Sequence, residues 1–324
     1  MQQKQKFNKI KNRNNSIDTF RGITILGMIF FTLTLKLSKN LPEYLKHNVY
    51  GSVHLGDFIL PMFLFASGLS LAYFIEKREK QKNLHKDVLK RFGKLALIGI
   101  SLSYFSAYNF LEMDEIMLSA LSFVICIAFY RFNWKIILGI IFLINLSYLV
   151  LIQFDKVSIF IGHYLGGYPA VIYYLPIMLI GLIIGKGIIS KGLWCKQNKI
   201  ILITIMIFFV FFWILTPINK MIVTPSFIMF SILFSLLVFA IINFVKNFKN
   251  SLIQLEYIGK KPLRFWLMMH VFFLIPFKFY IFYSKQNIPL KINWPIAIII
   301  SICLFILLWI ASYILDGLQK KYFS

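Results

Sequence analysis

Residues 15–31, NSIDTFRGITILGMIFF, carry an acid and an arginine three positions apart and then continue without a charge into apolar residues. Asp18 and Arg21 are one helical turn apart, so a helix would place both side chains on one face. A membrane-spanning helix needs about 20 apolar residues at a rise of about 1.5 Å per residue, and the run after Arg21 supplies them. The stretch therefore predicts a transmembrane helix with a pair of opposite charges at its start.

Apolar segments of this kind recur along the whole chain. The 324 residues are 59% hydrophobic and only 15% charged, with a mean hydropathy of +0.75. This composition excludes a soluble globular domain and is typical of a polytopic membrane protein. The apolar and polar alternation of a membrane barrel is absent, so we expect an all-α fold. We predict ten spans, at residues 19–37, 55–75, 92–110, 115–130, 136–153, 168–185, 198–217, 224–244, 262–283 and 294–315.

Lys and Arg residues are unevenly distributed between the segments that join these spans. If the amino terminus is cytoplasmic and the spans alternate, the inner segments and inner helix ends hold 27 of the 35 Lys and Arg residues. This asymmetry follows the positive-inside rule, and it predicts an even number of spans with both termini cytoplasmic. Much of the net charge of +23 would then fix topology and contact anionic lipid headgroups. The densest inner segment, residues 76–94, is basic enough to hold a polyanionic cytosolic ligand as well.

We expect a single transmembrane domain over residues 1–324, in the cell membrane. The first span is expected to remain as an anchor, because no small-x-small cleavage site follows it. The three cysteines are not placed for an external disulfide, and no Cys/His metal spacing is present, so no metal is expected. No soluble basic module for nucleic acid is found either.

A second group of titratable residues lies on the opposite side of the membrane in this topology. Residues 44–61, YLKHNVYGSVHLGDFILP, place His47 and His54 in the first outer loop and Asp57 at the outer end of the second span. A single loop histidine is usually solvated, but here two imidazoles and a carboxylate occur together, and His54 could line a cavity beside them. A buried carboxylate needs a hydrogen-bond donor, and a nearby imidazole is a natural one.

Two other features allow a structural or a functional interpretation. His270 is expected about 12 Å into the ninth span, where it would either bond between helices or line a polar cavity. Asp18 and Arg21 would be either an ion pair that fixes topology or the entrance for a cytosolic ligand.

Four stretches in this order resemble a known family: SIDTFRG and LGMIFF in the first span, KHNVYGSVHLGDFILPMFLFASGLSL after it, and IGKKPLRFWLMMH near the ninth span. They are similar to transmembrane acyltransferases of the heparan-alpha-glucosaminide N-acetyltransferase type. The resemblance implies acetyl transfer from cytosolic acetyl-CoA to a sugar amine or hydroxyl beyond the membrane. It also implies that His47 and Asp57 are catalytic and that Asp18 and Arg21 bind the co-substrate.

The expected function is therefore membrane-embedded acetyl transfer, with membrane lipids and an extracytoplasmic glycan or glycolipid acceptor as partners. Two mechanisms are open: an imidazole takes the proton of the attacking acceptor while Asp57 fixes its tautomer, or an acetyl-histidine forms. Whether the chain is a monomer or a homodimer is also open. The alternatives are a transporter or flippase for a polar lipid or glycan precursor, which would also need buried polar groups, and an inactive scaffold.

Overall fold

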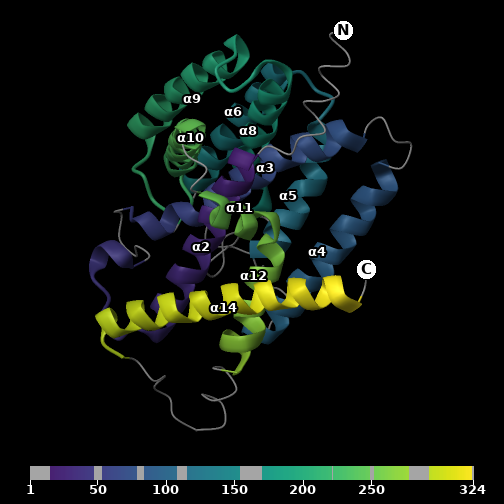
Figure 1. Cartoon of the computed structure of the whole chain (residues 1–324). Helices are drawn as coiled ribbons and strands as arrows, with labels where there is room; N and C mark the ends of the chain where they lie inside the picture. The colour runs from purple at the N-terminus through teal and green to yellow at the C-terminus, as the bar shows by residue number, and fades with distance from the viewer. Residues whose placement is uncertain are drawn as a thin grey trace.

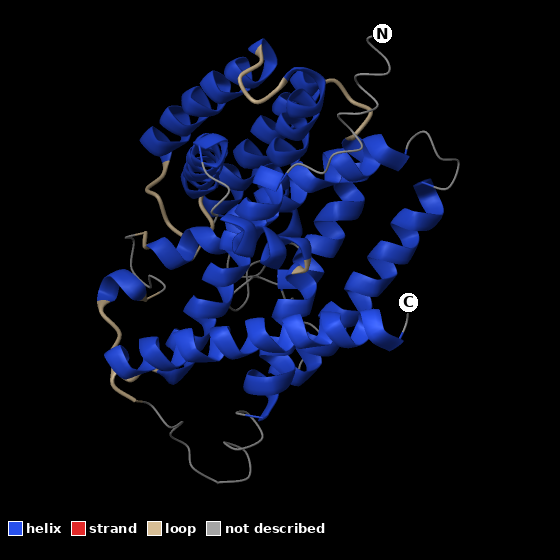
Figure 2. Cartoon of the chain, in the orientation of Figure 1, coloured by secondary structure: helices blue, strands red, loops and turns tan. Residues whose placement is uncertain are grey.

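The computed structural model describes residues 15–46, 53–78, 84–107, 115–153, 170–220, 222–248, 252–276 and 292–322. Over these ranges the chain forms helices joined by short turns and loops (Figures 1 and 2). Ser38 and Ile292 form an isolated parallel β-bridge between two of these loops. The protein is an all-helical polytopic membrane protein in its described part.

The helices follow one another along the chain in a simple order. They are α2 (Asn15–Leu37), the 3₁₀ turns η1 (Glu43–Leu45) and η2 (Leu55–Phe58), α3 (Ile59–Arg78), α4 (Leu84–Ala107), α5 (Glu115–Phe129), α6 (Trp134–Gln153), α8 (Ala170–Lys191), α9 (Lys196–Leu215), α10 (Pro225–Phe248), α11 (Ile253–Lys260), α12 (Pro262–Met269), the π-helical turn η4 (His270–Leu274) and α14 (Trp294–Tyr322).

Each of the ten predicted spans overlaps a helix, but they are not equally suited to cross a membrane. Among the described residues, seven helical segments are long and apolar enough: α2, η2 with α3, α6, α8, α9, α10 and α14. Helix α4 carries several charges in its first half, which explains why it does not qualify. Helix α5 has 15 residues, and α12 with η4 covers Pro262–Leu274. The structure thus supports seven candidate spans and shorter apolar helices, and the count of ten stays a prediction.

Helix α8 forms the centre of the bundle. Of its most apolar stretch, 83% is buried, and it packs against α3, α5, α6 and α10. Helix α14 is the opposite case, because only 17% of its corresponding stretch is buried. Figure 1 shows α14 crossing the molecule beside α2 and α12. Most of the apolar surface of α14 therefore faces outward, where lipid can cover it.

The short helix α11 packs tightly against the first part of α2, and the sequence did not predict it. A Cβ added to Gly259 would overlap the backbone carbonyl of Asp18, and one added to Gly22 would overlap the carbonyl of Leu255. Two glycines thus let the two backbones meet, as small residues do between membrane helices. This contact holds the junction of α11 and α12 beside the Asp18 and Arg21 pair.

Candidate functional site

A cavity of about 830 Å³ lies between α2, α3, α4, α5, α11 and α12. This is within the range of about 300–1,000 Å³ that is usual for ligand pockets. The lining extends along α3 from Lys77 to Phe63, which corresponds to about 21 Å of helix. The elements that enclose it come from both ends of the chain, and Figure 1 shows α2, α11 and α12 together at the middle of the molecule.

One end of this cavity is strongly basic. Its lining includes seven cationic side chains and one acid, Asp18; the cations are Arg21, Lys77, Arg91, Lys94, Lys260, Lys261 and Arg264. Three acids, Asp18, Glu256 and Asp316, offset part of this positive charge, and an anionic ligand would offset more of it. We call these seven side chains the basic mouth. Its composition is suited to a ligand with several phosphate groups.

The predicted pair of Asp18 and Arg21 is an ion pair at the basic mouth. An Nη atom of Arg21 lies 2.5 Å from an Oδ atom of Asp18, whose residue is only 2% exposed. A second Nη of Arg21 donates to the Oγ of Ser70 on α3 at 3.2 Å. The Ser70 hydroxyl in turn donates to the backbone carbonyl of Ala66 at 2.8 Å. Arg21 is therefore fixed in one orientation while it lines the cavity.

Arg91 of α4 is placed by aromatic rings. Its guanidinium lies over the rings of Phe74, at 4.9 Å, and Phe123, at 5.0 Å, while Arg78 covers Phe74 at 4.2 Å. The pKa of Arg91 is lowered to about 10, first because the protein removes water from the guanidinium and then because Arg21 and Arg78 carry like charge. Arg91 stays protonated near neutral pH and therefore adds a positive charge to the basic mouth.

The cations of α11 and α12 are held by two acids. Lys260 bonds the carboxylate of Glu256 at 2.6 Å, one helical turn earlier. Asp316 on α14 accepts a bond from Arg264 at 2.5 Å and another from Lys261. The hydroxyl of Tyr257 donates to the same carboxylate at 2.7 Å. Asp316 thereby fixes two cations of the basic mouth from a helix that is distant in the sequence.

Beyond the basic mouth the cavity is lined mainly by apolar side chains. Ile25, Met28, Phe63 and Ile116 lie there, with the hydroxyls of two serines and the indole of one tryptophan; these are Ser67, Ser119 and Trp266. A ligand that fills the cavity therefore needs a polyanionic head and a slender, mostly uncharged tail. Phe63 at the far end is six residues after Asp57, or about 9 Å along the helix.

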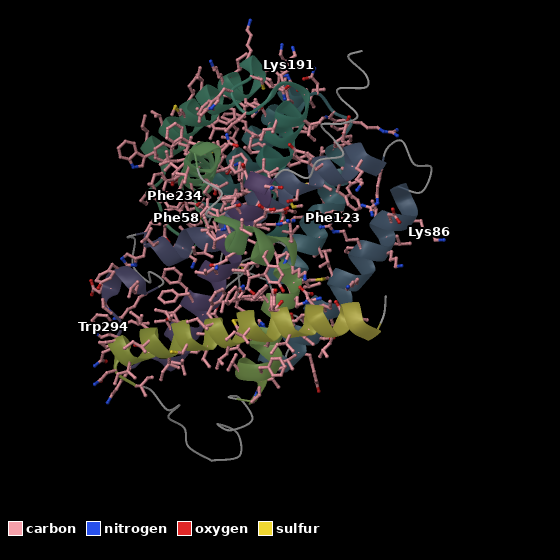
Figure 3. All side chains as sticks on the ribbon, in the orientation of Figure 1. Phe58, Lys86, Phe123, Lys191, Phe234 and Trp294 are labelled. Atoms are coloured by element: carbon pink, nitrogen blue, oxygen red, sulfur yellow. The ribbon has the colours of Figure 1, made fainter. Side chains whose placement is uncertain are left out.

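Asp57 lies in a second polar cluster, at the start of α3. Its carboxylate is fully buried and bonds the ammonium of Lys220 at 2.8 Å and the backbone N–H of His54 at 2.9 Å. Lys220 is in the turn between α9 and α10. Burial lowers the pKa of its ammonium, although the Asp57 carboxylate acts in the opposite direction. Phe58, the residue after Asp57, stacks on Phe234 of α10 with ring centres 4.6 Å apart (Figure 3).

Three histidines are candidate site residues in the sequence, and the two that the structure describes, His54 and His270, do not line the cavity. His47 lies outside the described residues. The imidazole Nδ1 of His54 is 3.1 Å from the backbone carbonyl oxygen of Lys46, and the described bond from His54 to Asp57 comes from its backbone. His270 is buried with its Nδ1 3.0 Å from the carbonyl oxygen of Trp266. Neither His54 nor His270 is among the described residues that line the cavity.

Several residues of these two clusters were not predicted. Residues 76–94 were expected to supply cations, and Lys77, Arg91 and Lys94 do line the cavity. Lys220 and Asp316 have no local signal, because their partners lie 163 and at least 52 residues away. In the described part of the chain, no group of three His, Cys, Asp or Glu residues is arranged to hold a metal ion.

The fold and the cavity define a multi-pass membrane protein with a cavity that is basic in one part and mainly apolar in the rest. Residues 13–208 match the family described as heparan-alpha-glucosaminide N-acetyltransferase, catalytic, and the chain belongs to this family. The matched part includes Asp18, Arg21, His47 and Asp57, and acetyl-CoA is the co-substrate of the family. No curated protein matches the chain.

Proposed function

We propose that this protein transfers an acetyl group from cytosolic acetyl-CoA to an amine or hydroxyl of a sugar on the outer face of the membrane. The observation that carries the proposal is a cavity that joins seven cations to an apolar interior. The phosphates of acetyl-CoA would bind at the basic mouth, where the planar fork of Arg21 can hold a phosphate oxygen while it stays paired with Asp18. The pantetheine arm would extend along the apolar part.

The sidedness of the proposal is supported by how the chain groups its charges. The start of α2, the end of α3, the first half of α4 and the junction of α11 and α12 are all on the inner side of the predicted topology, and all contribute to the basic mouth. Asp57, Lys220 and Glu115 belong to predicted outer segments, and Lys220 interacts electrostatically with each of the two acids. Two sets of segments that the charge count assigns to opposite sides thus form two separate clusters.

The chemistry would take place where the far end of the cavity approaches the Asp57 cluster. The acceptor nitrogen or oxygen forms a bond to the acetyl carbonyl carbon, and the imidazole of His47 takes the acceptor proton. The carbon–sulfur bond then breaks, and the thiolate of CoA leaves and is protonated. In the alternative route His47 first carries the acetyl group, with CoA leaving before the acceptor attacks. Asp57, which is paired with Lys220, would stabilise the positive charge that His47 gains in the first route.

Thioester turnover by the purified protein tests this function. The protein in lipid nanodiscs is mixed with acetyl-CoA and a panel of amino sugars and glycans, and the released CoA thiol is measured together with the acetylated product. We expect thiol release that depends on the acceptor and is lost in His47→Ala. A transporter or flippase would leave every substrate chemically unchanged, and this result would overturn the proposal.

A further inference from the structure

Trp266 of α12 presents a buried hydrogen-bond donor that the described protein does not satisfy. Its residue is 3% exposed, and it lines the cavity. The indole Nε1 is buried and has no hydrogen-bond acceptor among the described residues. An indole can only donate, and a buried donor without an acceptor is costly, so native proteins rarely retain one. A ligand in the cavity would remove this cost.

The position of Trp266 limits what that ligand group can be. Trp266 is two residues beyond Arg264 and about 6 Å into the helix that begins at Pro262. The side chains that follow it in the lining, Leu267 and Met268, are apolar. A charged group is unfavourable there, so the acceptor should be neutral and should follow directly after the anionic head of the ligand. An amide carbonyl in a flexible arm has these properties.

The indole ring of Trp266 packs against the imidazole of His270. His270, one turn later, bonds the carbonyl oxygen of Trp266 through Nδ1 at 3.0 Å, and the two rings are 4.8 Å apart. The π-helical turn η4 begins at His270, and such turns are frequent at functional sites. The neighbouring Phe265 is fully buried against Phe305 of α14 with ring centres 6.3 Å apart. The Nε1 atom itself has almost no accessible surface, so a small rotation of the indole toward the cavity is needed before the ligand can accept its N–H.

We propose that the Nε1–H of Trp266 donates a hydrogen bond to an amide carbonyl oxygen of the pantetheine arm and so sets the depth at which the thioester rests. This rests on the proposed function, because it takes acetyl-CoA as the ligand of the cavity. Trp266 is a binding and positioning residue rather than a catalytic one. In this proposal the basic mouth binds the phosphates and Trp266 binds the arm. The two contributions to affinity can be measured separately with ligands that have or lack the arm.

The test compares two ligands on matched variants. Isothermal titration calorimetry measures CoA and a 3′-phosphorylated adenosine diphosphate that lacks the arm, on wild type, Trp266→Phe and Trp309→Phe. Trp309 of α14 is half-buried and outside the cavity lining, so it controls for the loss of an indole. We expect the Kd of CoA to rise about tenfold in Trp266→Phe only, as for one lost hydrogen bond, with the nucleotide unaffected.

Three results would overturn the proposal. An unchanged Kd of CoA in Trp266→Phe would show that the indole does not bind the arm. An equal loss for both ligands would show a structural role. If wild type binds neither ligand, the proposed function is wrong and the role of Trp266 is wrong with it.

A second measurement keeps the test valid if Trp266→Phe does not fold. CoA analogues in which one amide group at a time is replaced by an ethylene group (–CH₂–CH₂–), which keeps the arm uncharged, are titrated into the wild-type protein. We expect one of the two analogues to lose about tenfold in affinity and the other to bind nearly as CoA does. Equal affinity of both analogues and CoA would contradict a hydrogen bond to the arm.

Discussion

Substitutions of Arg21 can show whether its ion pair with Asp18 is only structural or also binds a ligand. Arg21 bonds both Asp18 and Ser70 while its side chain lines the cavity. If the pair only fixes topology, Arg21→Lys should be nearly silent, because the charge is kept. A phosphate held by the planar fork predicts instead a rise of about tenfold in the Kd of acetyl-CoA, because Lys offers a point charge.

Calorimetric titration of acetyl-CoA into purified variants measures this difference. Arg131→Lys is the matched control, since Arg131 is an exposed residue between α5 and α6. Asp18→Asn should weaken binding as well, because Arg21 loses its fixed orientation. Unchanged affinity in both Arg21→Lys and Arg21→Ala would return the pair to a purely structural role.

Substitutions of the two histidines in the predicted outer loop should affect the rate of acetyl transfer and the affinity for acetyl-CoA differently. We predict that His47→Ala abolishes acetyl transfer and leaves the Kd of acetyl-CoA largely unchanged, since a general base contributes about 10²–10⁴-fold to rate. His54→Ala should be milder, because His54 contacts Asp57 through its backbone N–H, which the substitution retains. Initial rates of thiol release and calorimetric Kd values on the same preparations give both quantities. Near-normal turnover in His47→Ala would contradict the mechanism.

At the level of elements, the contact between α2 and α11 should be intolerant of a methyl group. Gly259→Ala would place a Cβ against the carbonyl of Asp18, so α11 would have to move away from α2. We predict a lower melting temperature and weaker acetyl-CoA binding, because the cations of the α11–α12 junction move too. Gly139→Ala in α6 is the control: nothing lies within 4 Å of the added Cβ, and alanine favours a helix. Equal melting temperatures in the two variants would show that the contact is not tight.

Helix α14 should influence the site although it lines none of the described cavity. Asp316 holds Lys261 and Arg264 in place, so Asp316→Asn should raise the KM for acetyl-CoA several-fold and leave kcat nearly unchanged. A double-mutant cycle with Arg264→Gln would then show coupling, because the two changes remove one interaction. Additive effects in this cycle would mean that Asp316 stabilises the protein without positioning the cations.

Hydropathy predicted most of the helices, and the spacing of Asp18 and Arg21 predicted a shared helix face. The basic segment 76–94 was also evident in the sequence, and its Lys77, Arg91 and Lys94 line the cavity. Helix α11 was not predicted because it is short and charged. Helix α4 begins eight residues before the predicted span 92–110, and Arg91 in this first part lines the cavity. The pairs of Asp57 with Lys220 and of Asp316 with Arg264 join distant parts of the chain. Such tertiary contacts leave no periodic signal in a single sequence.

For the whole molecule, the charge asymmetry predicts which side each segment faces. A cysteine introduced at position 47 should react with a membrane-impermeant thiol reagent from outside the cell. Cys195, between α8 and α9, is partly accessible in the structure and should react only after permeabilisation. Cys126 is buried and serves as an unreactive internal reference. Labelling of position 47 and Cys195 from the same side would contradict the ten-span topology.

In the proposed function, acetyl-CoA enters from the side of the basic mouth and its acetyl group leaves on the other side. Proteoliposomes with a known orientation can test this, with radiolabelled acetyl-CoA in one compartment and the sugar acceptors in the other. We predict labelled acceptor only when acetyl-CoA faces the Arg21 side, and none with Arg21→Ala at limiting acetyl-CoA. Intact acetyl-CoA in every arrangement, or labelled acceptor only in the compartment that holds acetyl-CoA, would contradict it.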